Sequence, residues 1–254
     1  MASAAVAREA VFALRREIAR IEGTLAERLV MPAGEGAAGG DAPAALLPTG
    51  VPRLDMALGG GLPRAALTEI HGRQARDAGA VAGFALALTA LTFREMASRA
   101  PVLWVAAGGT FAEAGAPYAP GILHRFGIPP QSLLVARARR LEDALWIAEE
   151  GAGLTALSAV LLEVCGPSRK LDLTATRRLH HRTRAAARPF YLLRQAGLPD
   201  PTAAPVRLVV SSAPAGERST LSGPLAGSIG PPAFTVSVSR SRTAIPATLT
   251  LEWN

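Results

Sequence analysis

The sequence predicts an α/β protein whose sheet is mainly parallel. Between residues 65 and 194, apolar runs typical of strands alternate with runs of helical periodicity, and such repetition is the pattern of successive βα units. Within it, LSAVLLEV (157–164) is apolar along most of its length, as expected of a central parallel strand covered on both faces. The last three apolar runs have no helical segment between them, which predicts antiparallel strands added at the edge of the sheet.

The expected elements follow in order along the chain. Strands alternate with helices in the first part, where we expect strand 65–72, helix 77–99, strand 102–107, helix 118–126, strand 133–137, helix 141–151, strand 157–164, helix 172–187 and strand 189–194. The alternating runs near the end predict the antiparallel strands 206–212, 234–241 and 247–253. Residues 213–232 are rich in Pro, Gly and Ser and predict a mobile loop.

The first thirty residues predict an amphipathic helical arm. Apolar residues recur there at steps of three and four, with charged residues on the other faces, at Val11, Leu14, Ile18, Ile21 and Leu25. The stripe is too short for a free-standing coiled coil, so it has to dock on its own core, a neighbouring subunit or a partner. The Gly-, Ala- and Pro-rich residues 31–46 read as a flexible linker. We therefore expect a docking arm (1–30), a linker (31–46) and a core domain (47–254).

Composition narrows the classes of function. A formal net charge of +7 favours an anionic partner, nucleic acid above all, although an arginine-rich surface would give the same balance. The single cysteine, Cys165, excludes an internal disulfide, and four histidines without ligand spacing predict no metal site. The charged N-terminus does not resemble a signal peptide, and the uncharged run 78–93 is short for a membrane span. We expect a cytoplasmic protein that does not associate with membranes.

The turn after the first core strand resembles a phosphate-binding loop without its key residues. A working loop reads G-x-x-x-x-G-K-[ST], in which backbone N–H groups cradle the phosphates, lysine reaches them and the hydroxyl binds Mg²⁺. If Gly72 is the first glycine, Asp77 takes the place of the second, Ala78 that of the lysine and Gly79 that of the hydroxyl residue. The sequence therefore predicts a degenerate nucleotide loop, with no bound cofactor and no catalytic residues.

The residues around that turn support the same interpretation. Asp77 stands where the next helix begins, and there it is expected to act as an N-cap, placing a carboxylate where a phosphate would lie. Arg73 and Arg76 are the cations that would offset this charge if an anion did bind. Glu163, at the end of the central strand, occupies the place of a Walker-B aspartate. Without the loop lysine, we interpret it as a strand-end residue bonded to backbone or arginine.

Three stretches of the core resemble known bacterial families. LPTGVPRLDMALGGGLPRAALTEIHG (47–72) is similar to the segment of RecA that leads into its nucleotide loop, and residues 118–150 and 171–187 are similar to ImuA, a RecA-like, SulA-related protein of damage-induced mutagenesis cassettes. The resemblance implies a RecA-like (P-loop NTPase-type) core. It also implies a role beside ImuB, a Y-family-polymerase-like protein, and an error-prone replicative-type polymerase. RecA assembles through an N-terminal helix and linker, which implies self-association through the arm.

Two groups of basic residues are candidate binding surfaces. Projection of helix 172–187 places one row on the face opposite its apolar residues, and that row consists of Arg177, His181 and Arg184, continued by Arg188. The second group follows strand 133–137, at the edge where α/β sheets usually bind ligands, and consists of Arg137, Arg139 and Arg140. Each group is suited to DNA or to an acidic partner surface, and each is equally compatible with a solvated face.

The sequence thus predicts a non-catalytic RecA-like accessory protein of error-prone translesion synthesis, part of the SOS response, that binds an ImuB-like partner and DNA. Two alternatives remain open at this point. A RecA-type DNA-dependent ATPase with an unorthodox loop would bind ATP, and it would lose that binding when Arg73 or Arg76 is replaced. An inhibitor of cell division, as in the SulA relatives, would block septation when overproduced.

Overall fold

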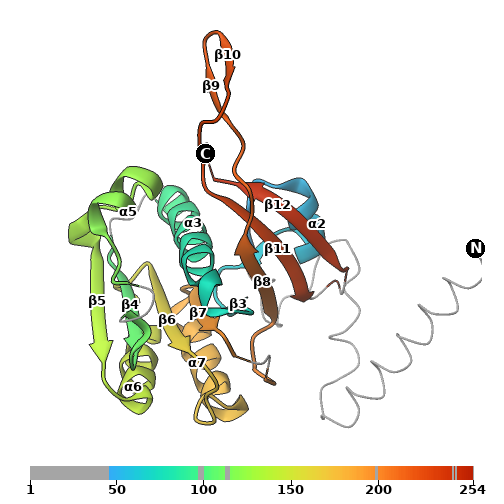
Figure 1. Ribbon diagram of the computed structural model, residues 1–254. Coiled ribbons are helices and arrows are strands. Elements are labelled where there is room, and N and C mark those ends of the chain that lie inside the picture. Colours follow the sequence, from blue (N-terminus) through green and yellow to red (C-terminus); the bar gives the residue numbers. More distant parts are fainter. Residues whose placement is uncertain are drawn as a thin grey trace, which may run out of the picture. The chain divides into compact units, whose positions relative to one another are not determined.

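Eight strands form one mixed sheet in the order β12-β11-β8-β3-β7-β6-β4-β5 (Figure 1). The strands are β3 (Leu67–Gly72), β4 (Val102–Ala107), β5 (Leu133–Ala138), β6 (Ala159–Cys165), β7 (Phe190–Gln195), β8 (Val206–Ser212), β11 (Ala233–Arg240) and β12 (Ala247–Glu252). Six of them, from β8 to β5, are parallel to one another, whereas β11 pairs antiparallel with both β8 and β12. The predicted α/β class with a mainly parallel sheet is confirmed.

This computed structural model describes residues 46–96, 100–111, 115–197, 200–241, 243 and 245–253. The predicted arm, with its stripe from Val11 to Leu25, and all of the predicted linker but Leu46 lie outside the described residues.

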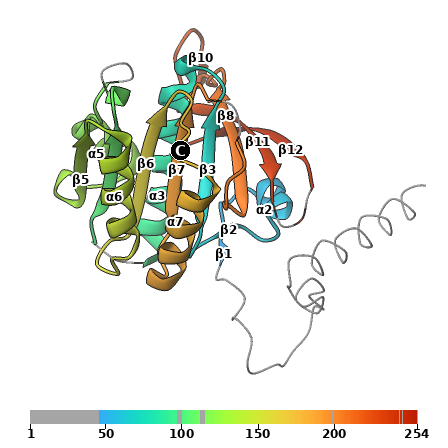
Figure 2. The same ribbon diagram turned by 90° about the horizontal axis from the view of Figure 1, so that it is seen from below.

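Helices cover both faces of the parallel part of the sheet (Figure 2). On one face α3 (Ala78–Met96) and α5 (Ala119–Phe126) share one core cluster with the strands, and on the other face α6 (Leu141–Ala152) and α7 (Leu173–Ala186) share a second. A short helix, α2 (Pro52–Leu58), lies beside β12. β6 is buried between these layers along almost its whole length. This burial explains why its sequence is apolar almost throughout.

The long apolar helix α3 belongs to the core of the sheet. Among the described residues, Ala75–Arg94 is long and apolar enough to cross a membrane, but most of it is buried inside the protein. Two of its threonines are buried and donate their hydroxyl protons to carbonyl oxygens one turn earlier, Thr89 to Ala85 and Thr92 to Leu88. This burial is compatible with a soluble protein, and it agrees with the interpretation of this run as a core helix.

The sequence prediction for β8 holds on one of its two sides. Residues 206–212 pair antiparallel with β11, as expected, but β8 also pairs in parallel with β3, so that Thr68 lies opposite Val206 and His71 opposite Val209. The chain therefore has to return from the end of β7 to the start of β8 through residues 196–205, which contain no helix among those described. Alternating apolar residues indicate a strand, but they carry no information about its direction.

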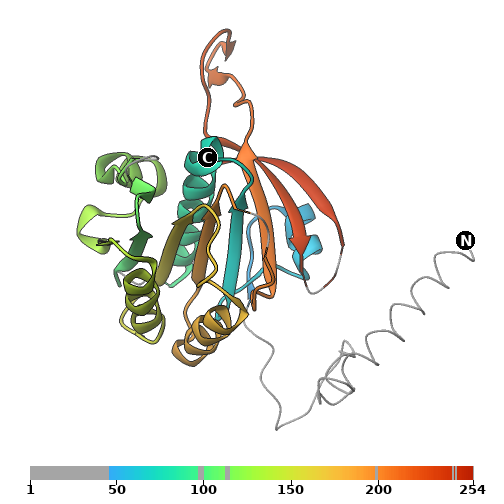
Figure 3. The same ribbon diagram turned by 60° about the horizontal axis from the view of Figure 1, so that its bottom comes forward.

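Residues 213–232 form a projecting segment with a short hairpin, where the sequence predicted a plain loop (Figures 1 and 3). Its strands are β9 (Arg218–Thr220) and β10 (Gly223–Leu225), which pair antiparallel. Gly223 has a φ of 114°, a conformation that side chains disfavour, and the hydroxyl of Thr220 donates to its carbonyl at 2.8 Å. A second pair, β1 (Leu46–Leu47) with β2 (Leu62–Pro63), also lies outside the main sheet.

Candidate functional site

The turn that follows β3 is closed on itself. β3 ends at Gly72, a 3₁₀ turn spans Ala75–Asp77, and α3 begins directly at Ala78. A Cβ atom on Gly72 would lie 2.9 Å from the Val81 Cγ2 atom and 3.1 Å from the Asp77 Cβ atom, so these side chains pack against the backbone where a phosphate loop would open. The strand–turn–helix order is present, but its turn has no open cradle.

Asp77 does not act as the N-cap that the sequence suggested. Its carboxylate accepts a hydrogen bond from the Gln74 backbone N–H at 3.1 Å, and the Gln74 side chain reciprocates in a capping box. The N–H of Ala78 already donates to the Ala75 carbonyl, because the 3₁₀ turn continues into α3. Asp77 is therefore buried inside the turn, while Arg73 and Arg76 beside it are exposed.

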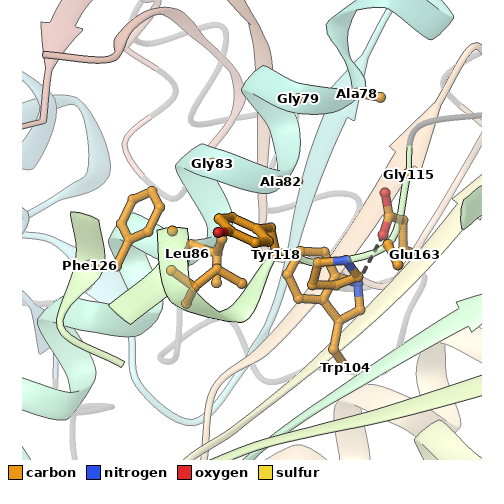
Figure 4. A pocket seen from close by; sticks show the side chains of 14 residues that line it. Ala78, Gly79, Ala82, Gly83, Leu86, Trp104, Gly115, Tyr118, Phe126 and Glu163 are labelled. Carbon is orange, nitrogen blue, oxygen red and sulfur yellow. Dashed lines mark hydrogen bonds between the residues drawn. The ribbon is translucent and has the colours of Figure 1, made fainter. Parts of the chain in front are cut away.

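A cavity of about 280 Å³ lies beside the first turns of α3 (Figure 4). Small residues of α3 form one wall, among them Ala78 and Gly79, the residues in the places of the loop lysine and hydroxyl. Tyr118, which is 71% exposed, and Trp104 provide aromatic surface, and Glu163 is the only charged residue of the described lining. The cavity thus offers apolar and aromatic contacts with one carboxyl group, and no cation for a phosphate.

Glu163 is held by two side chains that the sequence did not connect to it. The Trp104 indole N–H donates to its Oε2 atom at 2.9 Å, and the Gln195 amide donates to Oε1. Burial raises the pKa of Glu163 above its ordinary value, and the two hydrogen bonds oppose that rise. The expectation of a backbone or arginine partner was wrong. In the described part of the chain, no three His, Cys, Asp or Glu side chains form a group suited to a metal ion.

Removing the charge of Glu163 should change how stability depends on pH. Because the folded-state pKa is raised, the folded protein retains a proton that the unfolded chain loses above about pH 4.5, and stability falls as the pH rises through that window. In Glu163→Gln this loss of stability is absent, because the amide does not titrate. Its oxygen can accept from the Trp104 N–H, and its NH₂ group can donate to the Gln195 side-chain oxygen once that amide is flipped. Urea denaturation should therefore show the variant gaining stability over the wild type as the pH rises above 4.5.

The control for this prediction is Glu150→Gln. Glu150 is exposed on α6 and pairs with Arg182 at 3.2 Å, so its replacement should give a pH profile close to that of the wild type. Parallel profiles for wild type and Glu163→Gln would contradict the role assigned to the buried carboxyl group.

The two basic groups lie where the sequence placed them, with one change. Arg137, Arg139 and Arg140 are exposed at and after the carboxyl end of β5, and the Arg137 guanidinium lies 5.2 Å from the centre of the Phe111 ring. On α7, the exposed row consists of Arg177, His181 and Arg184. Arg188 does not simply extend this row, because its guanidinium donates to the Thr155 carbonyl at 3.2 Å.

A buried ionic network around Glu69 of β3 was not predicted from the sequence. Glu69 is fully buried and accepts from Arg207 Nε at 2.8 Å and from the Thr202 hydroxyl at 2.8 Å. Arg194 Nη1 lies 3.6 Å from the other carboxylate oxygen, and Arg194 Nη2 donates to Asp200 at 2.6 Å. The signal was present, because β3 carries Glu69 and β7 carries Arg194 although both strands are buried along their whole length.

The network fastens the connection between β7 and β8. Asp200 and Thr202 belong to that connection, and the Ala203 N–H donates to the Thr176 hydroxyl of α7. The described residues of this connection thus lie on the α7 side of β3, where a helix would lie in a longer βαβ unit. His71 faces the same network at 4.0 Å from Glu69, and burial lowers its pKa despite this neighbour. The arrangement is suited to fixing the crossover.

No protein-family model matches the chain and no curated protein does either, so its function has to be inferred from the residues described above.

Proposed function

We propose that this protein is a non-catalytic, RecA-like accessory protein of error-prone translesion synthesis in the cytoplasm, as its resemblance to the ImuA family implies. The order of elements supports a RecA-like core: a leading segment feeds β3, a turn and helix follow, and the sheet is completed by parallel strands. Its partners would be an ImuB-like Y-family polymerase homologue and, through it, an error-prone replicative-type polymerase, with DNA as a further ligand.

The closed turn after β3 is the observation that carries this proposal. Gly72 is packed against Val81 and Asp77, and Ala78 and Gly79 supply neither the cation nor the hydroxyl that a triphosphate and Mg²⁺ require. The neighbouring cavity adds one carboxyl group and no positive charge. A core of this kind is suited to binding partners through its surface. The two basic groups and the docking arm (1–30) are the regions that we assign to this role.

We expect no saturable ATP binding by the full-length protein. The absence of a cradle and of a cation at Ala78 would leave the triphosphate without its main contacts. Titration calorimetry with Mg²⁺ and ATP at micromolar protein is the measurement, and Arg73→Ala and Arg76→Ala are the comparison variants. Saturable binding that either variant abolished would contradict the proposal and favour the ATPase alternative.

Partner binding is tested with an ImuB-like Y-family polymerase homologue. Co-purification of the two proteins at micromolar concentration is the expected result, and its failure would count against the proposed function. Charge reversal of the exposed α7 row, Arg177→Glu with Arg184→Glu, then reports whether this face contacts the partner. Arg53→Glu, at an exposed position on α2, is the matched control. Normal cell division on overproduction would exclude the septation alternative.

A further inference from the structure

A second cavity, of about 570 Å³, opens at the carboxyl end of the sheet between β4 and β6. Its walls are the loop after β4 (107–110), the loop after β6 (164–170) and the first turn of α6. The two neighbouring strands lead to opposite faces, because β4 is followed by α5 on the α3 side and β6 by α7 on the other side. Diverging connections of this kind leave the crevice in which open α/β sheets bind their ligands.

The lining of this crevice carries an excess of positive charge. Arg169 and Lys170, the only lysine of the chain, lie on its β6 side and are both exposed. Glu142 is the only carboxylate of the described lining, and it is shared between Lys170 and Arg140, whose Nη2 atom lies 3.5 Å away. The described lining thus carries two cations and one carboxylate, a net charge of +1, and Arg140 beside it adds to the attraction for an anion.

A buried hydroxyl group in the same wall has no partner. The Oγ atom of Ser168 is inaccessible to water and makes no hydrogen bond among the described residues. Buried hydroxyl groups without a partner are rare in folded proteins, and Ser168 directly precedes the two cations in the sequence. Because its Oγ atom is not accessible from the crevice, the two cations are the contacts that the crevice offers to a phosphate.

The remaining lining residues identify the class of ligand. No aromatic side chain is among the described residues of the crevice, so it offers no surface on which a base could stack. Arg139 and Arg140 lie at the end of β5, the next strand beyond β4, and they continue the positive charge along the same edge of the sheet. A ligand bound here would be held by its phosphates and not by its bases.

We propose that the crevice between β4 and β6 binds phosphate groups of the single-stranded DNA backbone, without recognition of sequence. Arg169 and Lys170 provide the cations, and Glu142 weakens the attraction by holding Lys170. The proposal deepens the function given above and rests on it only for the choice of DNA as the source of the phosphate.

The test is the binding of a fluorescein-labelled oligothymidylate to the full-length protein, followed by anisotropy at several salt concentrations. Arg169→Ala should weaken binding about tenfold, as expected for one charge-assisted contact, and Arg169→Ala with Lys170→Ala should weaken it further. The slope of log K against log salt should become shallower by about one for each lost contact. Glu142→Gln should tighten binding several-fold, because it releases Lys170.

Two controls carry the same changes of charge at other places. Arg53→Ala removes an exposed arginine on α2, and Glu150→Gln removes an exposed carboxylate at the far end of α6. If Arg53→Ala weakened DNA binding as much as Arg169→Ala, or Glu150→Gln tightened it as much as Glu142→Gln, DNA would be attracted by the overall charge of the protein and not by the crevice. Either result would overturn the proposal.

Pyrophosphate, added as a competitor, distinguishes the two sources of phosphate. Weak competition by pyrophosphate supports the DNA backbone as the ligand. If pyrophosphate bound more tightly than DNA and the same variants weakened its binding, the ligand would be a small phosphate compound and the assignment to DNA would be overturned. Because none of these variants alters the α7 row or the arm, co-purification with the polymerase-like partner should be retained. A loss of DNA binding is thereby separated from a failure of the proposed function.

Discussion

Glu69→Gln should lower the free energy of unfolding by about 3–5 kcal/mol, the usual cost of removing one partner from a buried ion pair. The variant keeps the shape of the side chain but leaves the guanidinium groups of Arg207 and Arg194, which are largely removed from water, without their shared carboxylate. The Asp200 carboxylate is half-exposed and pairs with Arg194, whereas Arg207 donates to the Asp200 backbone carbonyl, so the Asp200 carboxylate does not replace Glu69. Urea denaturation at neutral pH followed by circular dichroism is the measurement.

Two further variants separate this effect from a general sensitivity to charge. Glu150→Gln breaks an exposed ion pair with Arg182 and should cost at most about 1 kcal/mol. Glu69→Met combined with Arg207→Met should cost less than the sum of the single changes, because the pair is removed together and no charge is stranded between them. A loss for Glu69→Gln no larger than that of the exposed control would contradict the importance of the network.

Trp104→Ala should lower the free energy of unfolding by a similar amount, about 3–5 kcal/mol. The indole is 3% exposed and packs edge-on against Phe111, with ring centres 6.3 Å apart. Its removal also deprives the buried Glu163 of the N–H bonded to Oε2, which leaves an unsatisfied carboxylate oxygen. Trp104→Phe, which keeps a ring but not the N–H, should fall between the wild type and the alanine variant in urea denaturation.

Added indole should restore part of the stability that Trp104→Ala loses. Trp104 borders the cavity beside α3, so the space left by its side chain can be reached from solvent. A ligand that binds only the folded state at tenfold its Kd raises the free energy of unfolding by about 1.4 kcal/mol. Indene, which has the same shape but no N–H for Glu163, should restore less. An equal response of the wild type to indole, measured by thermal melting, would contradict this placement of the ring.

The parts of the fold that depend on local pattern could be predicted from the sequence. β6 was predicted because both of its faces are covered and every position inside it is apolar except Glu163. The helices on either side of it were predicted from their periodicity, and α7 begins after Asp172, whose carboxylate accepts from the Ala175 N–H at 2.8 Å. In these segments the local preference and the final packing favour the same structure.

The features that depend on distant partners could not be predicted in the same way. The parallel pairing of β8 is set by β3, and the partners of Glu69 include Arg207, which is 138 positions away. Asp77 was assigned as a helix cap by a sound local rule, but its carboxylate instead accepts from the Gln74 N–H in the 3₁₀ turn before α3. Of the candidate site, the missing cation was evident from Ala78, whereas the link between Trp104 and Glu163 required the structure.

The position of β3 has a consequence for synthesis on the ribosome. β3 is the first strand of the main sheet to be made, yet its two neighbours are β7 and β8, with His71 opposite both Arg194 and Val209. Its edges, and the charge of Glu69, stay without their native partners until more than a hundred further residues have emerged. Pairings of such long range form late and slowly. A chain interrupted before Val209 would therefore expose an apolar strand, and premature termination should yield fragments that chaperones and proteases recognise.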